Sequence, residues 1–211
     1  MGALSIALIG GAGEGLGAAL GRRFSKAYEV VLSSRTQGEK ADLREEAQVV
    51  ELFERVEKRG PVEVAVFNAG ANFRASILDT PADMFEKLWR LGCYAGFLFG
   101  REAARRMLPR GKGTILFTGA TASVRGSAQF AAFAAAKGAL RQVAQSMARE
   151  LGPKNIHVAH VVIDGRIART DPPPDDMLAT DAIAELFWQI HMQPRSAWTF
   201  EADVRPWAEK F

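Results

Sequence analysis

The sequence predicts a doubly wound α/β fold, in which helices cover both faces of a parallel sheet in three layers. Short, continuous apolar runs, typical of strands buried on both faces, alternate along the chain with longer segments of helical periodicity. A glycine-rich turn also follows the first of these runs and leads directly into a helix. With 211 residues, of which 48% are hydrophobic, residues 1–211 suffice for one domain with a sizeable core.

The first half of the chain shows this alternation clearly. Strands are predicted over residues 4–9, 29–33 and 62–67, and helices over residues 16–27 and 45–59. Each predicted strand is a short, mostly apolar run, whereas the helices carry apolar side chains at helical spacing. Glycines close the first strand, and the pair Gly60–Pro61 ends the second helix.

The second half continues the pattern. Strands are predicted over residues 114–117, 156–163 and 198–204, helices over 80–108, 129–151 and 179–192, and a loop over 172–176. The first of these helices has a start signal, because Thr80 is an N-cap residue type, Pro81 suits the first turn and Asp83 is acidic. The pair Gly152–Pro153 ends the long alanine-rich helix.

One connection is too short for this fold. Only residues 35–41 separate the strand that ends near Ser34 from Asp42, whereas a parallel crossover needs about a dozen residues or more, usually with a helix. Either the protein lacks an edge strand and its helix, or residues of the molecule are absent from this sequence. Residues 36–40 resemble the start of a helix that never continues, which favours absent residues.

Composition and charge argue against a protein that mainly binds nucleic acid and against a membrane-spanning protein. Lys plus Arg total 27 and Asp plus Glu total 24, so the net charge is only +3, and no apolar run is long enough to span a membrane. One cysteine, Cys93, cannot form an internal disulfide, as expected in a reducing compartment. The first residues lack the features of a signal peptide, and Ile6 stands where myristoylation requires Ser or Thr. We expect a cytoplasmic protein with no membrane partner.

Two other clusters give weak signals. A group of basic residues ends one predicted helix: Arg101, Arg105, Arg106, Arg110 and Lys112. Cations at a helix C-terminus interact favourably with the helix dipole. Because no aromatic residues alternate with these basic residues, the cluster does not indicate nucleic-acid binding. His157 and His160 lie three apart on a predicted strand and therefore point to opposite faces, so we expect no metal site.

The strongest chemical signal is the turn Gly10–Gly17. Glycines between a strand and a helix allow a tight turn, and they let the backbone approach a pyrophosphate at the positive end of the helix. The alternative is that the turn needs glycine for structural reasons alone. Because the turn opens the first strand–helix unit, it favours dinucleotide binding.

Four motifs together resemble those of the short-chain dehydrogenases/reductases. Gly11, Gly15 and Gly17 fit that family's Thr-Gly-x-x-x-Gly-x-Gly pattern, with Gly10 at the Thr position. Residues 68–70 read Asn-Ala-Gly, residues 133–137 stand where the family has Tyr-x-x-x-Lys, and residues 163–165 stand near its Pro-Gly. The resemblance covers about residues 5–170 and implies a Rossmann-like fold that binds NAD or NADP.

The catalytic positions depart from the family pattern. By this resemblance, Phe133 stands where the family has a proton-donating Tyr, Ala120 where it has a substrate-binding Ser, and Cys93 where it has a relay Asn. Of the four catalytic residues, only the Lys is kept, as Lys137. The chain resembles a branch of the family that carries Phe for Tyr. Thr118, Thr121 and Ser123 offer hydroxyls nearby, but a hydroxyl of high pKa is a poor acid; their alternative role is to cap the strand end.

The resemblance also implies which residues hold the dinucleotide: Gly11, Glu14, Gly15, Leu16, Gly17, Arg35, Asp42, Leu43, Asn68, Ala69, Gly70, Lys137, Gly165 and Ile167. Arg35 suits the 2′-phosphate of NADP, whereas an NAD enzyme usually has Asp or Glu there. Glu14 would repel that phosphate, so the signals are mixed. They favour NADP, and NAD remains the alternative.

Two functions stay open. The first is an NADP-dependent oxidoreductase that reduces a carbonyl or an activated double bond through an altered proton path. The second is a dinucleotide-binding sensor or partner subunit without redox activity. The small-molecule substrate is not specified, because residues 166–177 carry no signature. The resemblance further implies a homodimer or homotetramer formed by the two long helices.

Overall fold

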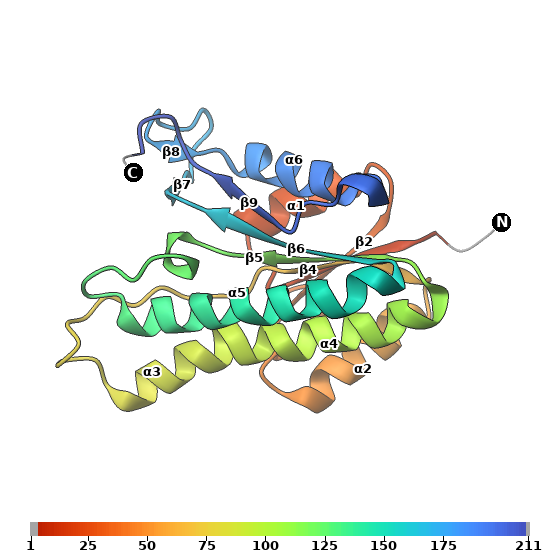
Figure 1. Ribbon diagram of the computed structural model, residues 1–211, viewed down its shortest axis with the longest axis horizontal. Helices are drawn as coiled ribbons and strands as arrows, with labels where there is room; N and C mark the ends of the chain where they lie inside the picture. The colour runs from red at the N-terminus through yellow and green to blue at the C-terminus, as the bar shows by residue number, and fades with distance from the viewer. Residues whose placement is uncertain (1–3, 210–211) are drawn as a thin grey trace.

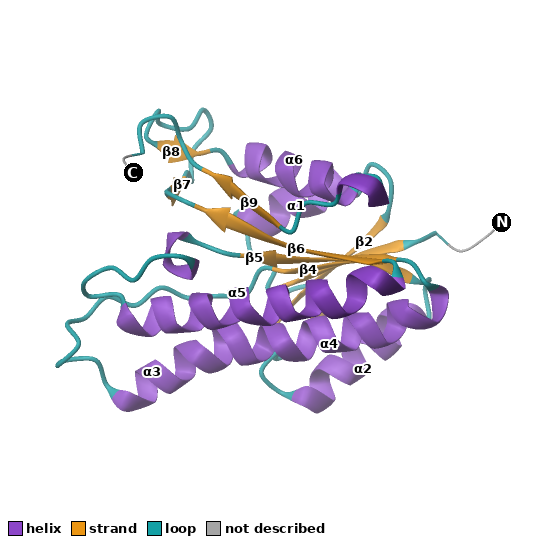
Figure 2. Cartoon of the chain, in the orientation of Figure 1, coloured by secondary structure: helices purple, strands orange, loops and turns teal. Residues whose placement is uncertain are grey.

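The computed structural model describes residues 4–209 and shows a parallel sheet between two layers of helices (Figures 1 and 2). The strand order is β3-β2-β1-β4-β5-β6-β9, and every neighbouring pair is parallel. The strands are β1 (Ile6–Gly10), β2 (Glu29–Ser34), β3 (Glu39–Lys40), β4 (Val62–Phe67), β5 (Gly113–Thr118), β6 (Ile156–Ile163) and β9 (Glu201–Val204). This architecture confirms the predicted Rossmann-like doubly wound fold.

The helices divide between the two faces of the sheet. They are α1 (Leu16–Phe24), α2 (Glu46–Glu57), α3 (Ala82–Trp89), α4 (Ala95–Met107), α5 (Ala131–Leu151) and α6 (Thr180–His191). Figure 2 shows α1 and α6 on one face, with α2, α4 and α5 on the other. No helix within residues 4–209 has the length and apolar character needed to cross a bilayer.

The apolar runs of the sequence reflect burial on both faces. In β1, Ile6 and Leu8 belong to the core beneath α2, α4 and α5, whereas Ala7 and Ile9 belong to the core beneath α1 and α6. Because alternate side chains enter opposite cores, every position of the strand must be apolar.

The short connection after β2 is closed by a tight turn. The Ser34 hydroxyl accepts hydrogen bonds from the Thr36 and Gln37 amides (3.2 and 2.8 Å), and the Ala41 amide donates to the Ser34 carbonyl (3.0 Å). Gly38 has φ +64°, and a Cβ there would lie 2.1 Å from the Leu32 carbonyl oxygen. The chain then pairs with β2 as the two-residue edge strand β3, so residues 35–38 make the crossover without a helix.

Several details differ from the sequence predictions. Thr80 does not cap α3, because its hydroxyl donates to the Ser76 carbonyl and Pro81 occupies the N-cap position without a side-chain hydrogen bond. The predicted helix over 80–108 is α3 and α4 joined by a π-helical segment, Arg90–Tyr94. A second small sheet pairs β7 (Arg166–Ile167) with β8 (Met177–Leu178), which the sequence did not predict.

Candidate functional site

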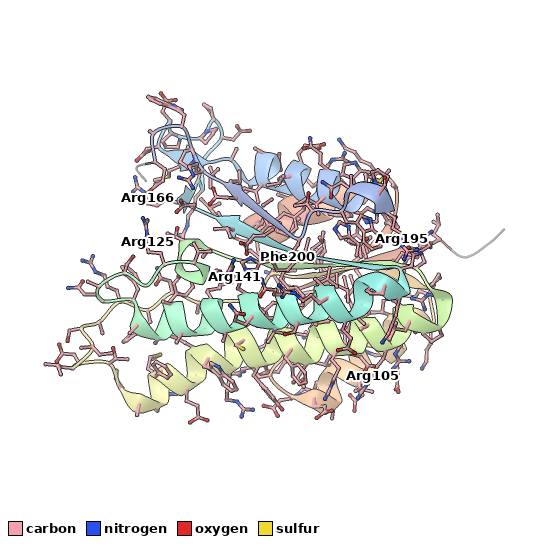
Figure 3. The ribbon with its side chains drawn as sticks, viewed as in Figure 1. Arg105, Arg125, Arg141, Arg166, Arg195 and Phe200 are labelled. Carbon is pink, nitrogen blue, oxygen red and sulfur yellow. The ribbon has the colours of Figure 1, made fainter. Side chains whose placement is uncertain are left out.

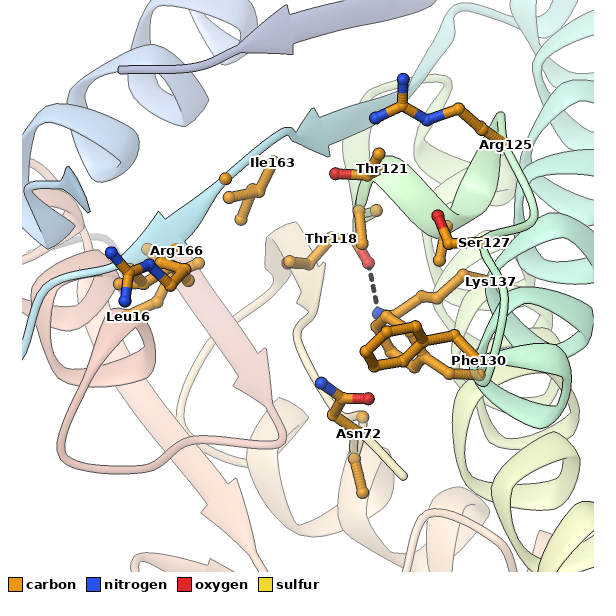
Figure 4. Close-up of a pocket in the computed structure, with 18 of the residues that line it drawn as sticks. Leu16, Asn72, Thr118, Thr121, Arg125, Ser127, Phe130, Lys137, Ile163 and Arg166 are labelled. Atoms are coloured by element: carbon orange, nitrogen blue, oxygen red, sulfur yellow. Dashed lines mark hydrogen bonds between the residues drawn. The ribbon is translucent and has the colours of Figure 1, made fainter. Parts of the chain in front are cut away.

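Three cavities lie along the carboxyl edge of the sheet, around the point where the strand order turns from β1 to β4. The first has a volume of about 650 Å³ (Figure 4), the second about 290 Å³ and the third about 610 Å³. Asn68 and Gly70 line both the first and the second, and Leu16 and Ile167 line both the first and the third. The three cavities therefore adjoin one another.

In the turn between β1 and α1, some glycines are closely packed against neighbouring residues and others face open space. Gly11 has φ +80°, and a Cβ there would lie 2.4 Å from the Ala69 amide nitrogen; a Cβ on Gly17 would lie 2.8 Å from the Ala12 Cα. In contrast, nothing lies within 4 Å of a Cβ built on Gly13 or Gly15. No side chain caps the N-terminus of α1 either, so the turn forms an open cradle at the positive end of a helix.

Asn68, at the end of β4, ties this turn to the neighbouring strand. Its amide nitrogen donates to the Gly11 carbonyl (3.2 Å), and its amide oxygen accepts from the Thr118 hydroxyl (3.1 Å). Three strand ends are thus held together by one side chain.

Lys137 projects from α5 into the first cavity and is 5% exposed. Its ammonium group donates to the Thr118 carbonyl at 2.8 Å (Figure 4). A Cβ on Gly70 would lie 3.2 Å from the Lys137 nitrogen, so glycine at position 70 leaves room for it. Burial lowers the pKa of Lys137 to about 8, because the charged form loses its hydration.

The structure brings together two of the three altered catalytic positions. Phe133 and Ala120 line the first cavity with Lys137, whereas Cys93 does not line it and is buried in the π-helical segment. Burial also raises the pKa of the Cys93 thiol. Gly92, the preceding residue of this segment, contacts α5, because a Cβ there would lie 3.0 Å from Ala136 Cβ. Neither Cys93 nor Gly92 has a side-chain amide that could replace the family's relay Asn.

The candidate replacement hydroxyls are engaged in local hydrogen bonds. Thr118 donates to Asn68, Thr121 donates to the Asp164 carboxylate, and Ser123 accepts from the Ala120 amide (3.1 Å). Thr118 and Thr121 line the first cavity, but Ser123 does not. These bonds stabilise the end of β5 and the turn that follows it.

The second cavity contains seven of the residues expected to hold the dinucleotide: Gly11, Arg35, Asp42, Leu43, Asn68, Ala69 and Gly70. Arg35 is exposed there. The Arg44 guanidinium donates to the Asp42 carboxylate (2.9 Å) and holds the pKa of that carboxyl below its usual range. Glu14 lines the third cavity with Gly15 and Arg169, not the second with Arg35. The carboxylate and the arginine that gave conflicting signals thus line different cavities.

Other sequence candidates lie away from this site. The basic residues near the end of α4 pair with carboxylates: Arg101 with Glu46, Arg105 and Arg106 with Glu102, Arg110 with Glu57, and Lys112 with Glu63. His157 stacks on Trp198, and His160 contacts the Glu201 carboxylate at 3.0 Å. No cluster of metal-ligating side chains occurs in the described part of the chain.

Sequence reasoning missed several residues that line the first cavity: Asn72, Arg125, Ser127, Phe130 and Arg166. They lie on loops and strand ends with no motif. Asn72 follows β4, residues 125–130 precede α5, and Arg166 begins β7.

The doubly wound sheet, with a glycine turn and a cleft at its carboxyl edge, defines a Rossmann-like α/β protein. Residues 5–171 match the family model for short chain dehydrogenases. The chain belongs to the short-chain dehydrogenase family of oxidoreductases.

Several relatives show the extent of this similarity. A cyclic-di-GMP-binding biofilm dispersal mediator protein of Escherichia coli is 34% identical, over 89% of this chain and 83% of its own. A short-chain dehydrogenase/reductase of Armillaria gallica is 30% identical, over 72% of this chain and 67% of its own. The crystal structure of a short-chain dehydrogenase from Rhodopseudomonas palustris is 41% identical, with a TM-score of 0.87, covering 96% of this chain and 99% of that one.

Proposed function

We propose that the chain binds a nicotinamide dinucleotide, NADP in preference to NAD, and uses it as an oxidoreductase with an altered proton path. The observation that carries this proposal is the row of adjoining cavities, which runs from Arg35 past the glycine cradle to Lys137. Several structural neighbours of the same fold were solved with NADP or NADPH, among them a metagenomic short-chain oxidoreductase.

The residues present fit such a group. The space beside Gly13 and Gly15 and the uncapped start of α1 suit a pyrophosphate. The Arg35 guanidinium suits the 2′-phosphate of NADP. Lys137 would hold the nicotinamide ribose in the first cavity, near Gly165 and Ile167. When bound, the dinucleotide supplies or accepts a hydride.

The proton path is the unusual part of the proposal. Phe133 has no proton to give, and we propose that it marks a branch of the family that keeps Lys and dispenses with Tyr. Lys137 is then the charged group beside the substrate, and its ammonium stabilises negative charge that develops there. A substrate that carries its own acid, or an activated double bond, suits such a site best.

The experiment that tests the proposal is a titration with NADPH and with NADH, followed by nicotinamide fluorescence. We expect micromolar binding of NADPH and weaker binding of NADH. Arg35→Gln should remove most of this preference, about tenfold, because a phosphate loses a charge-assisted partner. Arg149→Gln is the matched control, since Arg149 is an exposed arginine outside all three cavities. Failure of both nucleotides to bind at millimolar concentration would refute the proposal.

A second function is favoured by the apolar Phe133 and the engaged hydroxyls: the protein binds a nucleotide as a sensor or partner subunit and transfers no hydride. The E. coli relative is named for nucleotide binding. The double variant Phe133→Tyr, Ala120→Ser distinguishes the two. If the wild-type protein binds NADPH but reduces none of a panel of ketones and enones, and the variant does, the site retains binding but not chemistry.

A further inference from the structure

The first cavity is positively charged. Among the described residues that line it, the charged side chains are Arg125, Lys137 and Arg166. Of the carboxylates near the cavity, Asp164 is bound to the Thr121 hydroxyl and to Arg205, and Asp176 is bound to Arg166. Glu209 lies beside Gly165, where a Cβ would be 3.5 Å from its carboxylate. The remaining lining is apolar or neutral, so the cavity attracts an anion.

Arg125 stands out because its guanidinium is not paired. Within residues 4–209, the arginines that form no hydrogen bond through the side chain, no ion pair and no ring contact are Arg35, Arg125, Arg149 and Arg169. Arg35, Arg125 and Arg169 each line a different cavity, and Arg149 lines none of the three. Arg35 and Arg169 line the cavities proposed for the dinucleotide. Arg125 is therefore the unpaired arginine available to contact the substrate.

The position of Arg125 is fixed by the turn that precedes it. Its backbone amide donates to the Thr121 carbonyl (3.0 Å), and this turn directly follows β5. Figure 4 places the guanidinium at the rim of the cavity, with Ser127 between it and Lys137. Figure 3 shows Arg125 and Arg166 at one end of the molecule, away from Arg105 and Arg195.

We propose that Arg125 binds an anionic group, a carboxylate or a phosphate, on the substrate. The substrate is then a small organic acid whose apolar body lies against Phe130 and Phe133 and whose reacting carbon lies toward Lys137. This inference rests on the proposed function, because it takes the Lys137 end of the cavity as the nicotinamide end. Arg166 is neutralised by Asp176 and contributes less.

The test compares charged and neutral aldehydes of the same shape. By calorimetry, 4-formylbenzoate is titrated against 4-formylbenzamide, and 4-formylphenyl phosphate against its neutral dimethyl ester. Each titration uses the NADP⁺-loaded protein, in which no reduction occurs, and also the free protein. The two pairs distinguish a carboxylate ligand from a phosphate ligand.

We expect at least one acid to bind about tenfold more tightly than its neutral partner at low salt, because charge-assisted bonds to Arg are strong. Arg125→Gln should remove this difference while leaving the affinities of the neutral aldehyde and of NADP⁺ unchanged. Arg149→Gln, the matched exposed arginine, should change neither.

Two results would overturn the inference. One is that neither acid binds more tightly than its neutral partner, and the other is that Arg125→Gln retains the difference. Binding of NADP⁺ to the same samples reports on the proposed function separately. If NADP⁺ fails to bind, the proposed function is wrong, and the titrations of the free protein still decide whether Arg125 selects an anion.

Discussion

Lys137 keeps a cation inside the molecule, and this has a consequence for stability. Its pKa is about 8 in the folded protein, below the ordinary value of 10.5. Between these two values the unfolded chain binds more protons than the folded one, so the free energy of unfolding rises with pH. Below about pH 8 both states are protonated, and the buried charge destabilises the fold.

We therefore predict that Lys137→Met changes the pH dependence of stability. From about pH 7.5 to about pH 10, the free energy of unfolding of the wild-type protein should rise by up to about 3 kcal/mol relative to the variant. Denaturant unfolding of both proteins at the two pH values measures this difference. Parallel pH profiles would show that the Lys137 ammonium is not destabilised by burial.

Glu14 and Arg35 should act on different parts of the dinucleotide, because they line different cavities. Glu14→Gln removes a carboxylate beside the proposed pyrophosphate site, so we expect NADPH and NADH to bind more tightly by the same factor, about threefold at low salt. Arg35→Gln should affect NADPH alone. If Glu14→Gln strengthens only NADPH, then Glu14 faces the 2′-phosphate after all.

Motifs predicted part of the site residue by residue. Lys137, Asn68 and the glycines were found because they occupy fixed positions at strand ends and on one helix. Arg125 and Ser127 were not, because loops that line a substrate cavity follow no periodicity. Cys93, the residue at the family's Asn position by resemblance, is buried in the π-helical segment and does not line the first cavity.

At the scale of elements, the turn between β1 and α1 separates two roles of glycine. Gly11→Ala should destabilise the fold by about 2 kcal/mol or more, because φ is +80° and the new Cβ would overlap Ala69. Gly13→Ala should change the free energy of unfolding by only about 0.5 to 1 kcal/mol, since a Cβ there meets open space.

We also predict how one of these variants affects NADPH binding. Gly13→Ala should weaken NADPH about tenfold, because its methyl group enters the space proposed for the pyrophosphate. Urea unfolding and nicotinamide fluorescence on both variants measure stability and binding separately. Full NADPH affinity in Gly13→Ala would mean that the dinucleotide does not lie along this turn.

Long elements were predictable from the sequence, and short ones were not. Val62–Phe67 and Ile156–Ile163 have the predicted bounds because both faces of these strands are buried, which favours a mostly apolar run. β3, β7 and β8 have two residues each, too few to show any period. Their positions depend on tertiary pairing and, for β3, on the Gly38 turn.

For the whole molecule, the outer surface of α3 and α4 carries a run of exposed aromatic side chains: Phe85, Trp89 and Phe97. Trp89 stacks on Tyr94, with ring centroids 6.0 Å apart. An apolar surface of this kind suits an interface between subunits, as expected if the chain forms the homodimer or homotetramer that the family resemblance implies.

We predict that sedimentation analysis finds a dimer or tetramer at micromolar concentration. The double variant Trp89→Glu, Phe97→Glu should shift it to monomer, because buried apolar contacts between subunits would then face like charges. Circular dichroism serves as the control for folding. A wild-type monomer at all accessible concentrations would contradict the proposal.

The buried position of Cys93 also makes the chain convenient for spectroscopic labelling. It is the sole cysteine of the sequence, it is 5% exposed, and burial raises the pKa of its thiol, so little reactive thiolate is available. A cysteine introduced on the exposed loop between β7 and β8, for example at Asp175, would be the preferred site for a thiol-reactive dye. Fluorescence from that dye would report directly on whether this loop moves when ligands enter the adjacent cleft.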